Sequence, residues 1–201
     1  MKRRLFHLII LLIAATIDAG AQTAREVLDK TASTLDISSG VTAQFAISSS
    51  PVGTTSGTLD VKGNKFKITT PEAIVYFDGT TQWAYMKGNG EVNVSTPDQA
   101  TVQAINPIHF VNMYKEGYTG SLTTSGDSYE VHLTADSESQ SIKEMYITVA
   151  KSTYKLSNVK MLRKDKWVDV KISGCKSAAF ADSHFQFNAA DYPEAEIIDL
   201  R

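Results

Sequence analysis

The side chains with most chemical potential are few and far apart in this chain. Its single cysteine is Cys175, and the histidines beyond the first 21 residues are His109, His132 and His184. A thiol paired with His132 or His184 could act as a nucleophile with its general base, and clustered histidines could bind zinc. The histidines form neither an HExxH nor an HxH pattern, however, and one cysteine cannot complete a zinc ribbon. We therefore expect Cys175 to be a small apolar residue near a strand end, and we expect neither a metal nor a cofactor.

Two other catalytic patterns are equally weak. Paired carboxylates, the residue type that glycosidases use, occur at Asp136/Glu138 and Glu194/Glu196. They stand among turn and tail residues, which predicts solvated side chains. A GxSxG pattern, typical of serine hydrolases, is missing from the sequence. The chain is therefore not expected to be an enzyme, although a hydrolase with a nonstandard site stays open as a third hypothesis.

The N-terminus predicts export. A basic segment, Lys2–Arg4, precedes an apolar run, Leu5–Ile17, that ends at Ala19–Ala21. This order is typical of a secretory signal peptide, and the run is shorter than the roughly 20 residues that span a bilayer. We predict cleavage near Ala21-Gln22 and a single domain over residues 22–201 in the periplasm. Gln22 stands where a lipoprotein would carry its lipidated cysteine, so lipid anchoring by that route is not expected.

Charge and cysteine content exclude some classes of protein. The 201-residue chain has a formal net charge of -2, and removal of the basic leader makes it more acidic. A nonspecific nucleic-acid binder needs a basic surface to neutralise phosphates, and simple adhesion to anionic lipid needs the same. A lone cysteine forms no internal disulfide, so the fold must depend on its apolar core.

The elements predicted from the pattern are mostly short strands. Thr23–Glu26 fits a capping box and begins an amphipathic helix over 23–35. About ten segments then alternate apolar and polar residues between tight turns such as Asp78-Gly79, which predicts an antiparallel meander. The last predicted strand is 184–188. Two short helices interrupt the series, with starts at Thr96-Pro97 and Asn106-Pro107. Such a curved sheet has more inward apolar surface than one helix can fill, which predicts a lined cavity.

Several of these segments, taken in order, resemble one known family. The run 74–85, IVYFDGTTQWAY, resembles the DGK-x-x-W-x-Y hairpin of the periplasmic outer-membrane lipoprotein carrier (LolA-like) family. Gly57–Lys62 followed by Phe66 is similar to its G-x-L strand and the next turn. Asn106–Phe110 falls where the family has a helix, and Phe185–Asn188 resembles its F-x-F strand. The resemblance covers nearly the whole chain after the leader.

The resemblance implies an incomplete, strongly curved antiparallel β-barrel with a helical lid over a hydrophobic cavity. Family members carry the acyl chains of lipoproteins from an inner-membrane transporter to an outer-membrane receptor. By this resemblance the partners are acylated lipoproteins, an inner-membrane lipoprotein-releasing transporter and an outer-membrane receptor, and the carrier is a monomer. The residues expected to face the cavity are Phe45, Leu59, Phe66, Ile68, Trp83 and Tyr85. Those expected in the lid are Leu28, Leu35, Ile108, Phe110, Val111 and Tyr114.

One departure from the family concerns the turn after the G-x-L strand. Family members have an arginine directly after the lysine of this turn, and it tethers the lid. Here Lys62 is followed by Gly63, so the tethering contact does not transfer to this chain. A second hypothesis is a related binding module of the same fold, either a carrier of glycolipid or a sensor of lipoproteins. A sensor of that kind usually has an extra domain, and none is visible.

Overall fold

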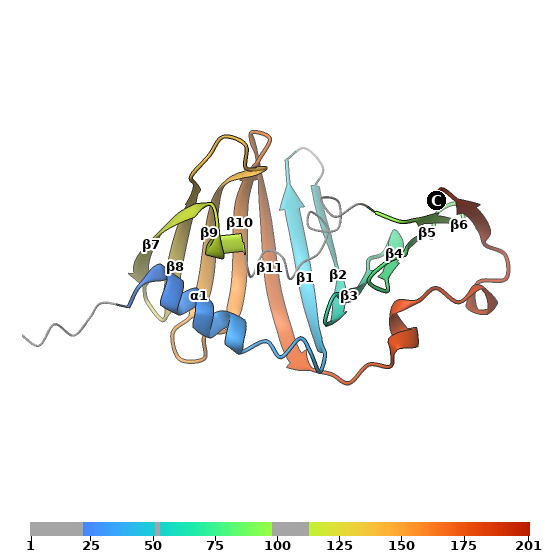
Figure 1. Ribbon diagram of the computed structural model, residues 1–201, viewed down its shortest axis with the longest axis horizontal. Coiled ribbons are helices and arrows are strands. Elements are labelled where there is room, and N and C mark those ends of the chain that lie inside the picture. The colour runs from blue at the N-terminus through green and yellow to red at the C-terminus, as the bar shows by residue number, and fades with distance from the viewer. Residues whose placement is uncertain (1–21, 51–52, 98–112) are drawn as a thin grey trace, which may run out of the picture.

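The computed structural model describes residues 22–50, 53–97 and 113–201 (Figure 1). The helices are α1 (Ala24–Ser33) and the short 3-10 helices η1 (Met113–Lys115), η2 (Asp182–Phe185) and η3 (Ala189–Asp191). The first six strands are β1 (Val41–Ser49), β2 (Gly53–Lys62), β3 (Lys65–Thr69), β4 (Ala73–Phe77), β5 (Gln82–Met86) and β6 (Glu91–Ser95). The other six are β7 (Tyr118–Ser125), β8 (Ser128–Ala135), β9 (Ile142–Ala150), β10 (Leu156–Arg163), β11 (Lys166–Ser177) and β12 (Glu196–Asp199).

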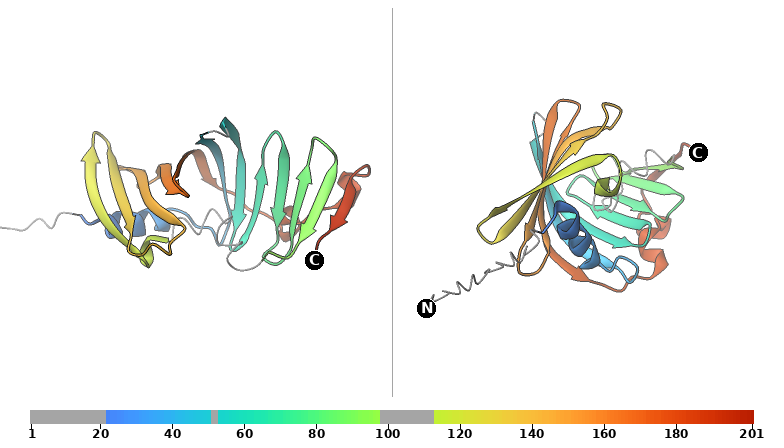
Figure 2. Two further views of the ribbon diagram at one scale, coloured as in Figure 1. Left: turned by 90° about the horizontal axis from the view of Figure 1, so that it is seen from above. Right: turned by 60° about the vertical axis from the view of Figure 1, so that its left-hand side comes forward.

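All twelve strands belong to one sheet, in the order β12-β6-β5-β4-β3-β2-β1-β11-β10-β9-β8-β7. Two hairpin series, β1–β6 and β7–β11, are joined where β1 pairs with β11, and every pair is antiparallel except β12 with β6. The sheet curves without closing, because β7 and β12 are its two edges (Figure 2). The prediction of an incomplete, strongly curved antiparallel barrel is confirmed.

Helix α1 begins where the capping box predicts. Thr23 Oγ1 accepts a hydrogen bond from the Glu26 backbone N–H, and the Glu26 carboxylate accepts one from the Thr23 N–H. This exchange satisfies backbone donors that a helix start leaves unpaired. Three apolar side chains of α1 are buried, Ala24, Val27 and Leu28, and the helix lies inside the curve of the sheet (Figure 2). We call the face of the sheet that carries α1 the inner face, and the opposite one the outer face.

The chain after β11 covers part of the outer face. We call residues 178–201 the C-terminal segment, and it follows the sheet from the end of β11 to the β6 edge (Figure 1). The hydroxyl oxygens of Tyr76 and Tyr192 lie 3.1 Å apart, and the Tyr85 and Tyr192 rings lie 4.5 Å apart. Phe187 stacks on Tyr192 and meets Tyr76 edge-on. Burial raises the pKa of Tyr76, and the hydrogen bond with Tyr192 raises it further.

The predicted strand at residues 184–188 is wrong. Its first two residues belong to η2, and the segment pairs with no strand among the described residues. Phe185 is completely buried, while Phe187 contacts the tyrosines of the outer face. The apolar alternation therefore arises from packing onto a sheet rather than from membership in it. The sheet gains its last strand later, where β12 lies parallel to β6.

The turn between β2 and β3 binds the C-terminal segment through two lysines. Lys62 Nζ donates to the backbone oxygen of Phe180 at 2.8 Å and lies 3.1 Å from Asp182 Oδ1. Lys65 Nζ lies 2.8 Å from the other carboxylate oxygen of Asp182. These hydrogen bonds, the one from Lys65 first, lower the pKa of Asp182. The contacts fix the start of the segment at η2.

We predict that this attachment weakens in acid. Asp182 has a lowered pKa in the folded state, so its stabilising effect is present above the ordinary aspartate pKa of about 3.9 and is lost as the pH falls through the lower folded value. The Asp182→Asn variant should show faster amide hydrogen exchange in residues 180–186 than the wild type at neutral pH. The difference should disappear in acid. An equal difference at both pH values would contradict the assignment.

Candidate lipid-binding face

The inner face carries a large buried cluster under α1. Val27 and Leu28 of the helix pack with strand residues of β8, β9 and β10. Strand pairing explains the alignment, because Val131 lies opposite Ile147, which lies opposite Val159. Residues directly opposite one another share a face of the sheet. The helix is therefore held by a row of side chains that crosses three strands.

A second, smaller cluster lies on the same face of β2, β3 and β4. It contains Val61, Phe66 and Phe77, each at most 3% exposed. The Phe66 and Phe77 rings are 5.1 Å apart, as expected for side chains directly opposite on neighbouring strands. This cluster stabilises the part of the inner face that is distant from α1.

Between the two clusters runs a set of half-buried apolar side chains that we call the apolar strip. Its register is continuous, since Phe45 is opposite Ile172 and Ile47 is opposite Val170 across the β1–β11 pair. Five strands, β11 and β1–β4, span about 19 Å at the usual strand spacing. The backbone of α1 approaches the sheet most closely at β7 and β8. The strip consists of Phe45, Ile47, Leu59, Ile68, Val75, Val168, Val170 and Ile172.

Four of the six residues predicted to face a cavity lie on the inner face. Phe45, Leu59 and Ile68 belong to the apolar strip, and Phe66 is buried in the cluster beside it. Leu59 is directly opposite Ile68, so these two residues meet as neighbours. The structure thus brings this part of the predicted set together.

Trp83 and Tyr85 are on the other face, and the prediction of one shared face is wrong for them. Phe77 pairs with Gln82 across the hairpin, so Gln82 shares the inner face while Trp83, opposite Tyr76, points outward. Tyr85 contacts the C-terminal segment. The physical reason is the register of the hairpin, since a shift of one residue reverses every side chain of a strand.

The structure describes three of the six predicted lid residues. Leu28 is buried in α1, whereas Leu35 follows the helix and is half-buried. Tyr114 is buried, and its hydroxyl donates a hydrogen bond to the Asp29 carboxylate of α1. Burial first, and then this bond, raises the pKa of Tyr114. The other three predicted lid residues lie outside the described residues, and they are Ile108, Phe110 and Val111.

The reactive groups do not assemble into a catalytic site within the described residues. Cys175 is half-buried in β11, and burial raises the pKa of its thiol, which disfavours the nucleophilic thiolate. His184 Nε2 lies 2.8 Å from Asp60 Oδ2, and His132 lies beside the carboxylate of Glu144. In the part of the chain that the structure describes, no group of three potential metal ligands occurs. His109 lies outside that part.

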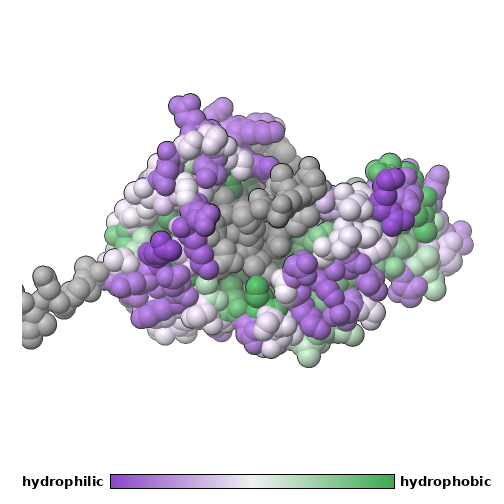
Figure 3. Space-filling view, viewed as in Figure 1, coloured by the Kyte–Doolittle hydropathy of each residue, from purple (hydrophilic) through white to green (hydrophobic). Residues whose placement is uncertain are grey.

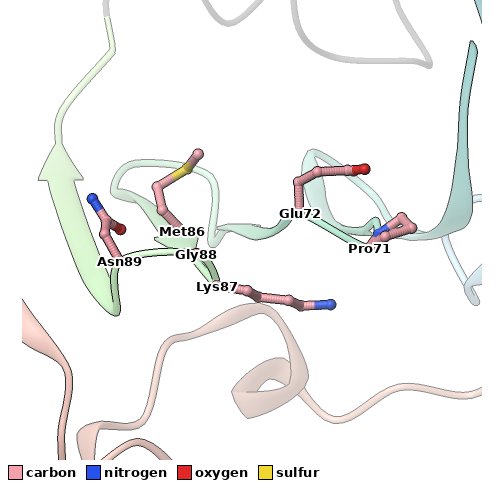
Figure 4. A pocket seen from close by; sticks show the side chains of 6 residues that line it. All are labelled: Pro71, Glu72, Met86, Lys87, Gly88 and Asn89. Carbon is pink, nitrogen blue, oxygen red and sulfur yellow. The ribbon is translucent and has the colours of Figure 1, made fainter.

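A shallow pocket lies at the strand ends rather than on the strip. It has a volume of about 530 Å³, and it lies between the β3–β4 turn and the β5–β6 turn (Figure 4). Lys87 Nζ bridges the two turns by donating to the Thr70 backbone oxygen. None of the six predicted cavity residues lines it. Its lining residues are Pro71, Glu72, Met86, Lys87, Gly88 and Asn89.

The prediction missed five of the eight residues of the strip, and three of these five belong to β11. The alternation of Val168, Val170 and Ile172 identifies one apolar face of this strand. The pairing of β11 with β1 joins residues more than 100 positions apart, and no turn connects them. A pattern confined to one strand therefore could not show that these side chains adjoin Phe45.

These features are typical of a fold that binds a partner or a ligand on its inner face. An open, curved sheet with one helix inside it presents an apolar inner surface, and such surfaces mark sites for partners or ligands. A family model described as "Outer membrane lipoprotein carrier protein LolA" matches residues 14–165. The chain belongs to this family. The match ends at the β10–β11 turn, so the whole of β11 and the C-terminal segment lie beyond it.

A solved structure shows the same fold at low identity. An uncharacterized conserved protein from Thermus thermophilus superimposes with a TM-score of 0.58 and 12% identity, over 89% of this chain and 99% of that one. A LolA superfamily protein from Nitrosomonas europaea gives a TM-score of 0.45 and 13% identity, over 83% of this chain and 99% of that one. No curated protein sequence matches. Among the described helices, none has the length and apolarity needed to cross a membrane.

We predict that Gly57 is needed for the packing of the strip. Gly57 lies opposite Phe45, and a Cβ atom there would come within 2.0 Å of the Thr69 backbone oxygen and 3.0 Å of the Phe45 ring. Gly57→Ala should therefore lower the free energy of unfolding by about 1–3 kcal/mol, as overpacking does. Chemical denaturation measures this. Gly88→Ala is the control, because a Cβ atom there meets nothing within 4 Å, and equal effects would contradict the prediction.

Proposed function

We propose that this protein is a periplasmic carrier that holds the acyl chains of lipoproteins against the apolar strip. The observation that supports the proposal most directly is the strip itself, where eight apolar side chains on neighbouring strands stay half-buried between two fully buried clusters. A contiguous apolar surface of this kind is typical of a ligand or partner site. Membership of the lipoprotein carrier family supplies the ligand class.

The energetics of acyl transfer suit such a surface. Burying acyl carbon is worth about 0.8 kcal/mol per CH2, so one chain of about 16 carbons is worth on the order of 10 kcal/mol. A carrier between two membranes must offer comparable apolar contact and release it on demand. This exchange needs no catalytic group, and it requires a donor and an acceptor, for which we propose an inner-membrane transporter and an outer-membrane receptor. The N-terminal leader supports the periplasmic location.

The first prediction of this proposal concerns what the protein carries from the cell. After purification from the periplasm, extraction with organic solvent and mass spectrometry should identify acylated lipoprotein or its lipidated N-terminal peptide. Extracted glycolipid would favour the related binding module instead. A protein that yields no lipid and binds no apolar probe would contradict acyl binding altogether.

A second prediction separates the two faces of one strand. Ile47 belongs to the strip and to neither buried cluster, whereas the next residue, Ser48, is exposed on the outer face. Ile47→Asp should weaken binding of a fluorescent diacylated lipopeptide by roughly 10- to 100-fold, the value of one lost aliphatic contact. Ser48→Asp carries the same charge and should bind normally. Equal affinities for both variants would contradict the assignment of the strip, provided circular dichroism shows that both are folded.

A further inference from the structure

The hairpin between β10 and β11 concentrates positive charge at one end of the sheet. Arg163, Lys164 and Lys166 are exposed around a single acidic residue, Asp165, and Lys160 is exposed nearby on β10. Among the described residues, none of these four cations forms a salt bridge. Because the whole chain has a net charge of -2, this tip differs in sign from the protein around it. Figure 3 shows hydrophilic side chains gathered over the ends of β8–β11.

Local stability does not explain the choice of residues at this tip. Lys164 and Asp165 have φ values of 48° and 61°, the left-handed conformation for which two-residue hairpins prefer Asn-Gly. Arg163 also lies directly opposite Lys166, and like charges in that position destabilise a sheet. The hairpin therefore has cations at positions where both the backbone conformation and the pair of like charges disfavour folding. Strain of this kind marks a position with a role outside stability.

An exposed aromatic residue adjoins the cations. Trp167 is 37% exposed and lies on the outer face, where Lys160 Nζ is 4.8 Å from the centre of its ring. The Tyr146 ring lies 5.8 Å from the Trp167 ring and stacks on His132. Tryptophan favours the water–membrane boundary, and lysine and arginine are attracted to anionic lipids. An exposed tryptophan next to lysine and arginine is the set of residues that interfacial membrane anchors use.

We propose that the β10–β11 hairpin is a docking surface for anionic phospholipid membranes. The net charge of the whole chain does not favour anionic lipid, but the local positive charge of the hairpin does. The exposed Trp167 at its border fits a lipid headgroup layer better than an acidic protein surface. Val168 follows Trp167 and belongs to the apolar strip on the opposite face. Docking would therefore bring one end of the strip to the membrane surface. The proposal concerns the membrane and stands independently of acyl binding.

Vesicle flotation with the full-length mature protein tests the proposal. The protein should float with vesicles of phosphatidylcholine and phosphatidylglycerol at low salt, and it should not float with phosphatidylcholine alone. Added salt should release it, because exposed charges are screened. The triple variant Arg163→Gln, Lys164→Gln, Lys166→Gln should lose about 100-fold in partitioning, since each cation near an anionic surface contributes roughly fivefold.

A charge-matched variant separates this hairpin from net charge. Lys30→Gln, Lys155→Gln, Lys176→Gln removes the same three charges at exposed positions elsewhere, and it should float like the wild type. Equal losses in both triple variants would overturn the proposal. So would flotation with both kinds of vesicle regardless of salt, or binding to an acidic protein without binding to vesicles.

The emission of Trp167 provides a site-specific readout. The chain has two tryptophans, so Trp83→Phe leaves Trp167 as the single reporter. Its emission should shift to shorter wavelength with phosphatidylglycerol vesicles and stay unchanged with phosphatidylcholine. An unchanged emission in a sample that floats would overturn the assignment to this hairpin. Lipopeptide binding measured on the hairpin triple variant should be normal, which distinguishes failure of docking from failure of the carrier proposal.

Discussion

A single open sheet has two faces, and in this chain no second sheet is present among the described residues to cover either one. Each face must therefore be buried by whatever else the chain supplies. Helix α1 covers the inner face near β7 and β8, and the C-terminal segment covers the outer face of β2–β6. These covers act on opposite faces at opposite ends of the sheet. Between them, on the inner face of β11 and β1–β4, apolar side chains stay half-buried, and the apolar strip follows from this arrangement.

The alternation of side chains along each strand decides which residues belong to the strip. Patterns within a strand predicted the strands well, because apolar residues recur at every second position in β1 and β3. In β4 the residues Ile74–Phe77 are all apolar, so alternation does not show which side chains point to the inner face. Because β5 pairs with β4, the orientation of Trp83 and Tyr85 could not be predicted either. Both faces of these strands are in fact covered, with Phe77 buried on one side and Tyr76 on the other. A doubly buried strand hides its orientation from sequence patterns.

The predictions that succeeded rest on local interactions. The capping box at Thr23 and the tight hairpin turns involve residues close in sequence. The residue types at those few positions are therefore enough to predict them. The curved antiparallel sheet follows from many such turns in series. The pairing of β1 with β11, the path of the C-terminal segment and the parallel β6–β12 pair depend on contacts between distant residues. Their stabilisation comes from non-directional burial, which many alternative pairings would also satisfy. The strip contains residues from both sides of the β1–β11 pair, so the part that β11 supplies was not predictable from turns and strand patterns.

Gly63 has a local structural role in the turn between β2 and β3. Gly63 has a φ of 59° and donates its N–H to the Ile37 backbone oxygen at 2.7 Å, a conformation that suits glycine. Lys62 shares the outer face with Asp60, and it binds the C-terminal segment there. Its side chain therefore acts on the face opposite α1. In the described structure, the contact that ties η1 to α1 is the hydrogen bond between Tyr114 and Asp29. The turn thus secures the C-terminal segment on the outer face of the sheet.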